Sequence, residues 1–232
     1  MRTSGSIFIS SLLLLLTAMP LMAQSSKGTA EEESSFAFKG VSVGVDTYGY
    51  INTLFDDYVS SEVAVQANFG NRFFPVVEIG YGSTDTTDDM TGIYYKSGAP
   101  YFRIGMNYNF LYKKKGKLSG YKLYGLARYG WTKAEYDVKS PLITDPVWGG
   151  TTELDLTGIE ASCSWFELGV GVQVKVWKIF HMGWSIRYKS RLKEGEGENS
   201  QVWYIPGYGE NKSSSFGGTC SLIIDIPFGK NQ

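Results

Sequence analysis

After residue 23 the sequence alternates between apolar residues and small or charged ones, and this alternation limits the fold more than any other feature. Side chains on a β-strand point to opposite faces in turn, so each alternating segment predicts a strand with one apolar face. No continuous apolar stretch of about 18 residues occurs in 24–232. If this part of the chain spans a membrane, it does so as strands and not as a helix.

Eight segments show the alternation, at 40–46, 59–69, 76–82, 101–110, 121–131, 165–176, 182–189 and 216–228. One face of each is apolar, and the other holds Gly, Ser, Asn and charged residues. The small and charged face suits the inside of an eight-stranded barrel, which side chains just fill, and the apolar face then contacts lipid. The sequence predicts an all-β fold: an eight-stranded antiparallel transmembrane β-barrel with meander order. If the segment at 151–159 extends a hairpin above the membrane, the barrel has ten strands, and this stays an alternative.

The connections between these segments alternate in length. Those at 47–58, 83–98, 132–162 and 190–215 are longer than those at 70–74, 111–120 and 177–181. Outer-membrane barrels have short periplasmic turns and long extracellular loops. The order therefore predicts a membrane barrel, whereas a soluble β-sandwich has no reason to follow it. Aromatic residues gather near the segment ends, as in interfacial girdles.

The first residues read as an export signal. Arg2 precedes an apolar run at 7–16, and Pro20 precedes Met22-Ala23-Gln24. We expect a signal peptide at 1–23, a disordered periplasmic lead-in at 24–36 and the barrel at 37–232. A transmembrane anchor is the alternative, but the run is short for about 30 Å of hydrocarbon. The expected location is the bacterial outer membrane.

The face expected to point inward carries charges of both signs. Its candidate network is Glu62, Glu78, Arg103, Arg128, Glu167, Lys175, Arg187 and Asp225. An isolated buried charge is very costly, so these groups would have to pair inside a narrow barrel. One hypothesis is a structural plug of salt bridges. The alternatives are a gated proton or ion path and a ligand-binding charge cluster.

Two of the long connections are rich in aromatic residues, among them Trp148, Trp203, Tyr204 and Tyr208. Exposed Trp and Tyr are common in recognition surfaces, so these side chains are candidate extracellular-loop contacts. They could equally pack on each other as a lid over the barrel mouth.

Composition argues against several functions. The formal net charge is −1, which gives no electrostatic case for nucleic acid. The chain has one histidine, His181, expected in a periplasmic turn, and two cysteines, Cys163 and Cys220. Triad chemistry and a metal site both lack their usual residues. We expect no enzyme activity, no cofactor, no metal and no catalytic residue.

Six motifs together resemble a known family: APYFRIGMNYN at 99–109, DPVWGG at 145–150, CSWFE at 163–167, GWSIRYKSRL at 183–192, WYIPGYG at 203–209 and GGT at 217–219. They look like an uncharacterised outer-membrane-barrel family, a domain of unknown function from anaerobic Gram-negative bacteria. More generally the chain is similar to small OmpA- and OmpX-like barrels. The resemblance implies a porin-like β-barrel and no transferable activity.

These observations favour a non-enzymatic barrel with a surface-binding, adhesion or envelope-structural role through its extracellular loops. The first alternative is a barrel that binds or transports a small solute with its interior charges, and the second is a lipid-modifying enzyme. Expected partners are outer-membrane lipid and lipopolysaccharide, the barrel-assembly machinery during biogenesis, and a surface ligand that the sequence does not identify.

Overall fold

The computed structural model describes residues 37–47, 49, 58–113, 120–141, 143–144, 149–153, 155–195 and 202–227. The expected signal peptide at 1–23, the lead-in at 24–36 and Trp148 lie outside these residues.

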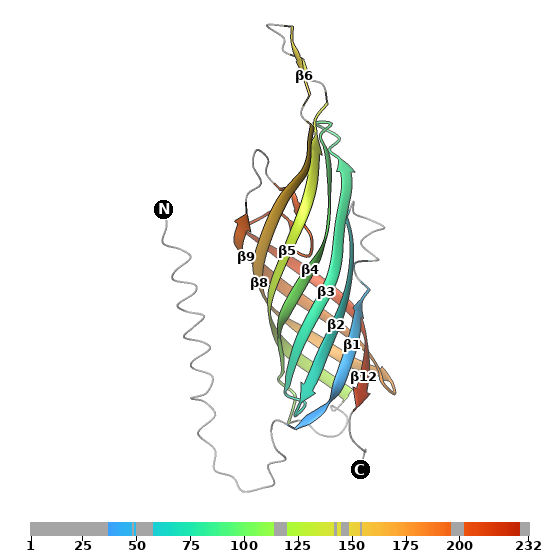
Figure 1. The fold of residues 1–232 in the computed structure, drawn as a ribbon. Coiled ribbons are helices and arrows are strands. Elements are labelled where there is room, and N and C mark those ends of the chain that lie inside the picture. The colour runs from blue at the N-terminus through green and yellow to red at the C-terminus, as the bar shows by residue number, and fades with distance from the viewer. Residues whose placement is uncertain are drawn as a thin grey trace. The chain divides into compact units, whose positions relative to one another are not determined.

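Eight long strands form one closed barrel (Figure 1). They are β1 Phe38–Asp46, β2 Tyr58–Phe69, β3 Phe73–Thr87, β4 Tyr94–Asn109, β5 Tyr121–Lys139, β8 Asp155–Trp177, β9 Phe180–Gly195 and β12 Ser214–Pro227. Each pairs antiparallel with the next, and β12 pairs with β1. The predicted eight-stranded antiparallel meander is confirmed. No helix in the described residues is long and apolar enough to cross a membrane.

Two short strand pairs lie outside the barrel ring. They are β6 Ile143–Thr144 with β7 Thr151–Thr152, and β10 Tyr204–Ile205 with β11 Gly209–Glu210. The segment at 151–159 is divided between β7 and the start of β8. It therefore adds no strand to the barrel.

The barrel strands differ greatly in length, which corrects the expected connections. β1 has 9 residues and β12 has 14, whereas β5 has 19 and β8 has 23. Most of the expected loops at 83–98 and 132–162 are continuous strand, and β3 joins β4 through residues 88–93 alone. In Figure 1, β3, β4, β5 and β8 rise as a wall above the rest of the barrel. We call this projecting part the outer wall.

An apolar belt covers the outward face of the barrel. On β5 it runs from Tyr121 to Trp131, and on β8 its exposed members include Leu168, Val170 and Val172. A strand of about 9–11 residues, tilted by about 45°, crosses the hydrocarbon of a bilayer. The belt has that length on β5. Exposed apolar surface of this extent matches the lipid-facing band of a membrane barrel.

Aromatic pairs border the belt at both ends. Phe102–Trp131 and Tyr188–Phe216 lie at the end of the outer wall, with ring centroids 5.7 and 5.2 Å apart. At the other end, the pairs are Phe38–Phe69, Phe73–Tyr108 and Trp177–Phe180. Tyr and Trp rings favour the membrane interface. The belt is therefore bounded by two aromatic girdles.

Polarity reverses where the strands leave the belt. On β5, outward Lys133 and Lys139 pair with Glu160 and Asp155 of β8 at 2.7 and 3.3 Å. The inward side chains of the same stretch are apolar and buried, as at Tyr136. The outer wall thus has a charged outside and an apolar inside, like a sheet of a water-soluble protein.

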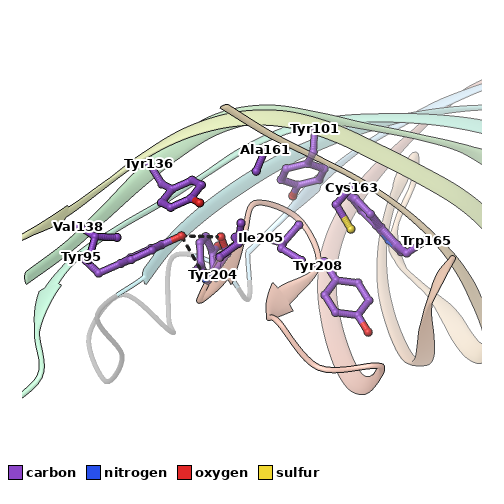
Figure 2. Packing of buried hydrophobic residues seen from close by; sticks show 11 residues of the cluster. Tyr95, Tyr101, Tyr136, Val138, Ala161, Cys163, Trp165, Tyr204, Ile205 and Tyr208 are labelled. Atoms are coloured by element: carbon purple, nitrogen blue, oxygen red, sulfur yellow. Dashed lines mark hydrogen bonds between the residues drawn. The ribbon is translucent and has the colours of Figure 1, made fainter. Parts of the chain in front are cut away.

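The apolar side of the outer wall forms a compact cluster with residues 202–208 (Figure 2). We call this cluster the upper core and residues 202–213 the insert. The upper core consists of Tyr95, Tyr101, Tyr136, Val138, Ala161, Cys163, Trp165, Val202, Tyr204, Ile205 and Tyr208. The Tyr95 hydroxyl donates to the Tyr204 carbonyl at 3.2 Å. The insert therefore covers the wall from the lumen side.

The belt predicts a depth-dependent penalty for charge. Val170, 57% exposed, lies near the middle of the belt, so Val170→Arg should lower the free energy of unfolding by about 2–4 kcal/mol. Ser83→Arg, at the edge of the outer wall, should cost about 0–1 kcal/mol. Reversible denaturation of the barrel in phospholipid vesicles measures both. Equal costs would contradict the belt.

Candidate functional site: an ion cluster and a vestibule

The centre of the lumen holds six charged side chains, one from each of six adjoining strands. In ring order from β2 to β9 they are Glu62, Glu78, Arg103, Arg128, Glu167 and Arg187, which we call the ion cluster. All six are buried. Three carboxylates face three guanidinium groups, so the cluster is formally neutral.

The strand register brings these side chains together. Glu78 is paired with Arg103 across β3 and β4, and Arg128 with Glu167 across β5 and β8. Small residues make room beside them. A Cβ at Gly80 would lie 2.2 Å from the Tyr101 ring, and one at Gly130 would lie 2.4 Å from the Trp165 ring. Inward glycine thus lets large side chains of neighbouring strands fill the narrow lumen.

Glu78 is the hub of the ion cluster. Its carboxylate lies 3.0 Å from Arg128 Nε, 3.1 Å from Arg187 Nη1 and 3.2 Å from Arg103 Nη1. Glu167 lies 3.3 Å from Arg187 and 3.5 Å from Arg103. Glu62 pairs with Arg103 Nη2. Charges this deep need such partners, because an unpaired buried ion is strongly destabilising.

Neutral groups connect the ion cluster to its surroundings. Trp165 Nε1 donates to Glu167 at 2.7 Å, and the Tyr101 hydroxyl donates to Glu62 at 2.9 Å. On the opposite side, Arg128 donates to Asn107 Oδ1 at 2.7 Å. The cluster is therefore a hydrogen-bonded plug across the lumen, and it contacts the upper core directly.

Two members of the candidate network lie apart from this plug. Lys175 is exposed near the end of β8. Asp225 forms a separate group with Lys122 at 3.6 Å, His181 at 3.4 Å and Ser42 at 2.6 Å. The expectation of one network of eight residues is thus corrected, because Lys175 and Asp225 lie near the opposite end of the lumen from the outer wall.

His181 lies in β9 and is buried, not in the expected turn. Its Nδ1 faces Asp225, and the Ser42 hydroxyl donates to the other oxygen of that carboxylate. The serine thus bonds to the acid and not to the imidazole. This arrangement differs from a nucleophile held by a general base. The described residues contain no group of three or more metal-ligating side chains.

The aromatic loop candidates separate into buried and exposed residues. Tyr204 and Tyr208 are 4% and 1% exposed, which corrects their assignment as extracellular contacts. Burial raises the pKa of both hydroxyls. Trp203 is half-exposed and packs edge-on against Tyr95 at 5.6 Å. The insert therefore acts mainly as a lid, and Trp203 is its exposed aromatic side chain.

A cavity of about 370 Å³ lies between the ion cluster and the insert. We call it the vestibule. Its lining includes Tyr58, Ser60, Glu62, Tyr101, Arg103, Arg187, Lys189, Tyr204 and residues 215–219. A smaller space of about 50 Å³ lies on the other side of the cluster and shares Asp46, Glu62, Arg187 and Thr219 with the vestibule. The ion cluster thus lies between two polar chambers.

Sequence reasoning missed the inward aromatic residues Tyr101 and Trp165, which hydropathy alone assigned to the lipid face. The position of each residue in the alternating pattern would have predicted that it points inward. Tyr101 lies two residues before Arg103, and Trp165 two residues before Glu167, so each shares a face with an inward charge.

A family model matches residues 5–231 of the chain. The chain belongs to the family "Domain of unknown function (DUF6048)". This confirms the resemblance to a domain of unknown function, while its link to anaerobic bacteria stays a prediction. No curated protein matches the DUF6048 chain significantly.

Several solved structures are similar to this DUF6048 protein. A major outer membrane protein from Thermus thermophilus has a TM-score of 0.49 at 11% identity, with 82% of this chain and 100% of that one covered. Acinetobacter baumannii CarO2 has a TM-score of 0.44 at 12% identity, covering 82% and 99%. Neisserial surface protein A has 0.39 at 12%, covering 83% and 98%. At such identities no residue role is transferred.

The hub position predicts a large effect of Glu78→Gln. Removing this charge deprives Arg128 and Arg187 of a carboxylate inside the lumen, and the free energy of unfolding should fall by about 3–5 kcal/mol. The control is Glu160→Gln, whose ion pair with Lys133 is exposed and screened by water, so its loss should change the free energy of unfolding far less. Denaturant titration in vesicles compares them. Similar losses would show that the ion cluster is not critical.

Proposed function

We propose that this DUF6048 protein is a non-enzymatic β-barrel of the bacterial outer membrane, whose extracellular end has a binding or envelope-structural role. One observation carries the proposal: the reversal of polarity along β5 and β8, from an apolar outside at the belt to a charged outside on the outer wall. Lipid favours the first surface and water the second. The same strands therefore serve as a membrane span and as a folded extracellular structure.

Orientation follows from the two ends of the barrel. At one end, β2 joins β3 through residues 70–72, and β8 joins β9 through Lys178 and Ile179. The opposite end bears the outer wall and the insert. Short turns face the periplasm in outer-membrane barrels. The outer wall, the insert and the vestibule then face the cell exterior.

The rim with the short turns fits contact with phospholipid headgroups. The Arg72 guanidinium lies 4.9 Å from the Phe73 ring centroid and 4.7 Å from that of Tyr112. Lys178 lies 4.9 Å from the Trp177 ring. Cations held on interfacial aromatic rings are well placed to attract anionic lipid. Lipopolysaccharide and the barrel-assembly machinery stay proposed partners.

The second candidate function is binding of a small solute. The observation that favours it is the vestibule, whose volume lies at the lower end of the range of ligand pockets, about 300–1,000 Å³. Binding in the vestibule does not require transport across the membrane, because the solute would stop at the ion cluster, which lies in the lumen below the vestibule.

Surface labelling tests the orientation. Lys133 is exposed on the outer wall and Lys178 lies in a short turn. On intact cells, a membrane-impermeant maleimide should modify Lys133→Cys at least about tenfold faster than Lys178→Cys, because only the first faces the exterior in a barrel oriented by its turns. Both should react after lysis. The chain without an added cysteine is the control. The reverse preference would overturn the orientation.

A closed lumen predicts little ion conduction. In planar bilayers the intact protein should give no steady open-channel current, because the ion cluster closes the lumen. A porin recorded in the same lipid provides the open-pore comparison. A steady current of porin size would contradict closure and favour transport.

A further inference from the structure

The vestibule exists because the insert fills only part of the barrel mouth. Tyr204, Ile205 and Tyr208 pack on the apolar side of the outer wall, as Figure 2 shows. The cavity remains between the insert and the shorter strands β2 and β12. Its rim includes the exposed residues Glu210, Lys212 and Phe216, so it is reached from the end of the barrel that bears the wall.

The charged groups around the vestibule already have partners within the protein. Arg187 pairs with Glu78 and Glu167, and Arg103 pairs with Glu62. Lys189 Nζ donates to the carbonyl oxygens of Gly207 and Tyr208, each at 3.0 Å. Asp46 accepts from the Cys220 amide, and Lys212 pairs with Glu210. An ionic ligand would have to compete with these contacts.

What the cavity offers a ligand is hydroxyl groups and aromatic rings. The Ser60 hydroxyl lies at its wall, 3.2 Å from the Tyr101 hydroxyl, which donates to Glu62. A hydroxyl has one donor hydrogen and two acceptor lone pairs, so one with a protein partner can still accept from a ligand. The Tyr58 and Tyr204 rings are stacked, with centroids 5.6 Å apart and planes inclined by 28°. Hydroxyls both donate and accept hydrogen bonds, and aromatic rings pack against C–H groups. This combination matches a molecule with many hydroxyl groups and weakly polar C–H faces.

We propose that the vestibule binds a neutral polyhydroxylated ligand, a sugar of one or two rings, at the extracellular end of the barrel. Amino acids and sulfated sugars fit less well, since they would have to displace the contacts that the charged groups of the lining already make within the protein. A purely apolar ligand would desolvate the hydroxyls and ions of the lining. The assignment to the cell exterior rests on the proposed function, but the binding chemistry does not.

The test is isothermal titration of the full barrel, refolded in a detergent without a sugar headgroup. The probes are glucose, maltose, glutamate, arginine and a sulfated disaccharide. We expect saturable binding of glucose or maltose with a dissociation constant at or below the millimolar range, and at least about tenfold weaker binding of the charged probes.

Ser215→Phe places a ring at the rim of the cavity and should weaken sugar binding at least about tenfold. Ser60→Ala removes one hydroxyl at the wall and should weaken it by about 3- to 10-fold. The matched control is Ser162→Phe on the outward face of β8, which should leave binding unchanged. Each variant is first checked for the mobility shift of a folded barrel in unboiled gel samples.

Absence of sugar binding by a folded barrel would overturn the inference and leave the proposed membrane role intact. Tighter binding of glutamate, arginine or the sulfated sugar would also overturn it, in favour of an ionic ligand. A chain that shows no mobility shift and stays soluble without detergent would instead overturn the membrane proposal. Sugar binding unaffected by Ser215→Phe would place the site elsewhere.

Discussion

Backbone hydrogen bonding in hydrocarbon is the constraint on which the rest of this structure depends. Lipid offers no partner to a peptide N–H or C=O, so a sheet that spans a membrane has to close on itself. Closure with eight strands leaves a lumen that side chains just fill. Polar side chains in that lumen are then buried and must satisfy one another. The ion cluster meets this requirement with equal numbers of carboxylates and guanidinium groups.

The strands that contact lipid at the belt continue into the outer wall, where they contact water. Alternation continues without interruption along β5, but the two faces exchange character between Trp131 and Lys133. Below this point the barrel is apolar outside and charged inside, and above it the reverse holds. The insert covers the apolar side of the wall, and Trp165 touches both regions through its hydrogen bond to Glu167 and its packing on Tyr208 at 5.8 Å. The membrane-spanning part of the barrel and the outer wall therefore form one continuous packed unit.

Much of the fold could be predicted from the sequence, because period-two alternation depends on local geometry alone. The inward positions of Glu78, Arg103 and Glu167 follow from it directly. The upper ends of the strands could not be found by the same rule. On β5, an apolar outward face can be followed in the sequence only to Trp131. The charged residues Lys133 and Glu135 come next on that face, and charged residues after an apolar strand predict a loop. The partition of the charges into an ion cluster and a separate Asp225 group depends on register and depth, which no single segment encodes. The same holds for burial of Tyr204, which depends on the tertiary contact with Tyr95.

The short length of β1 has a consequence for assembly. Its 9 residues must join β2, its neighbour in sequence, and β12, which lies at the far end of the domain. Hairpins such as β8–β9 bring together nearby residues and can form early, whereas the seam between β1 and β12 closes a loop of almost the entire barrel. The seam with the greatest entropic cost is thus made by the shortest strand of the barrel. Closure of this seam is the step at which a nearly complete sheet becomes a barrel, and the same seam is where the barrel would first come apart.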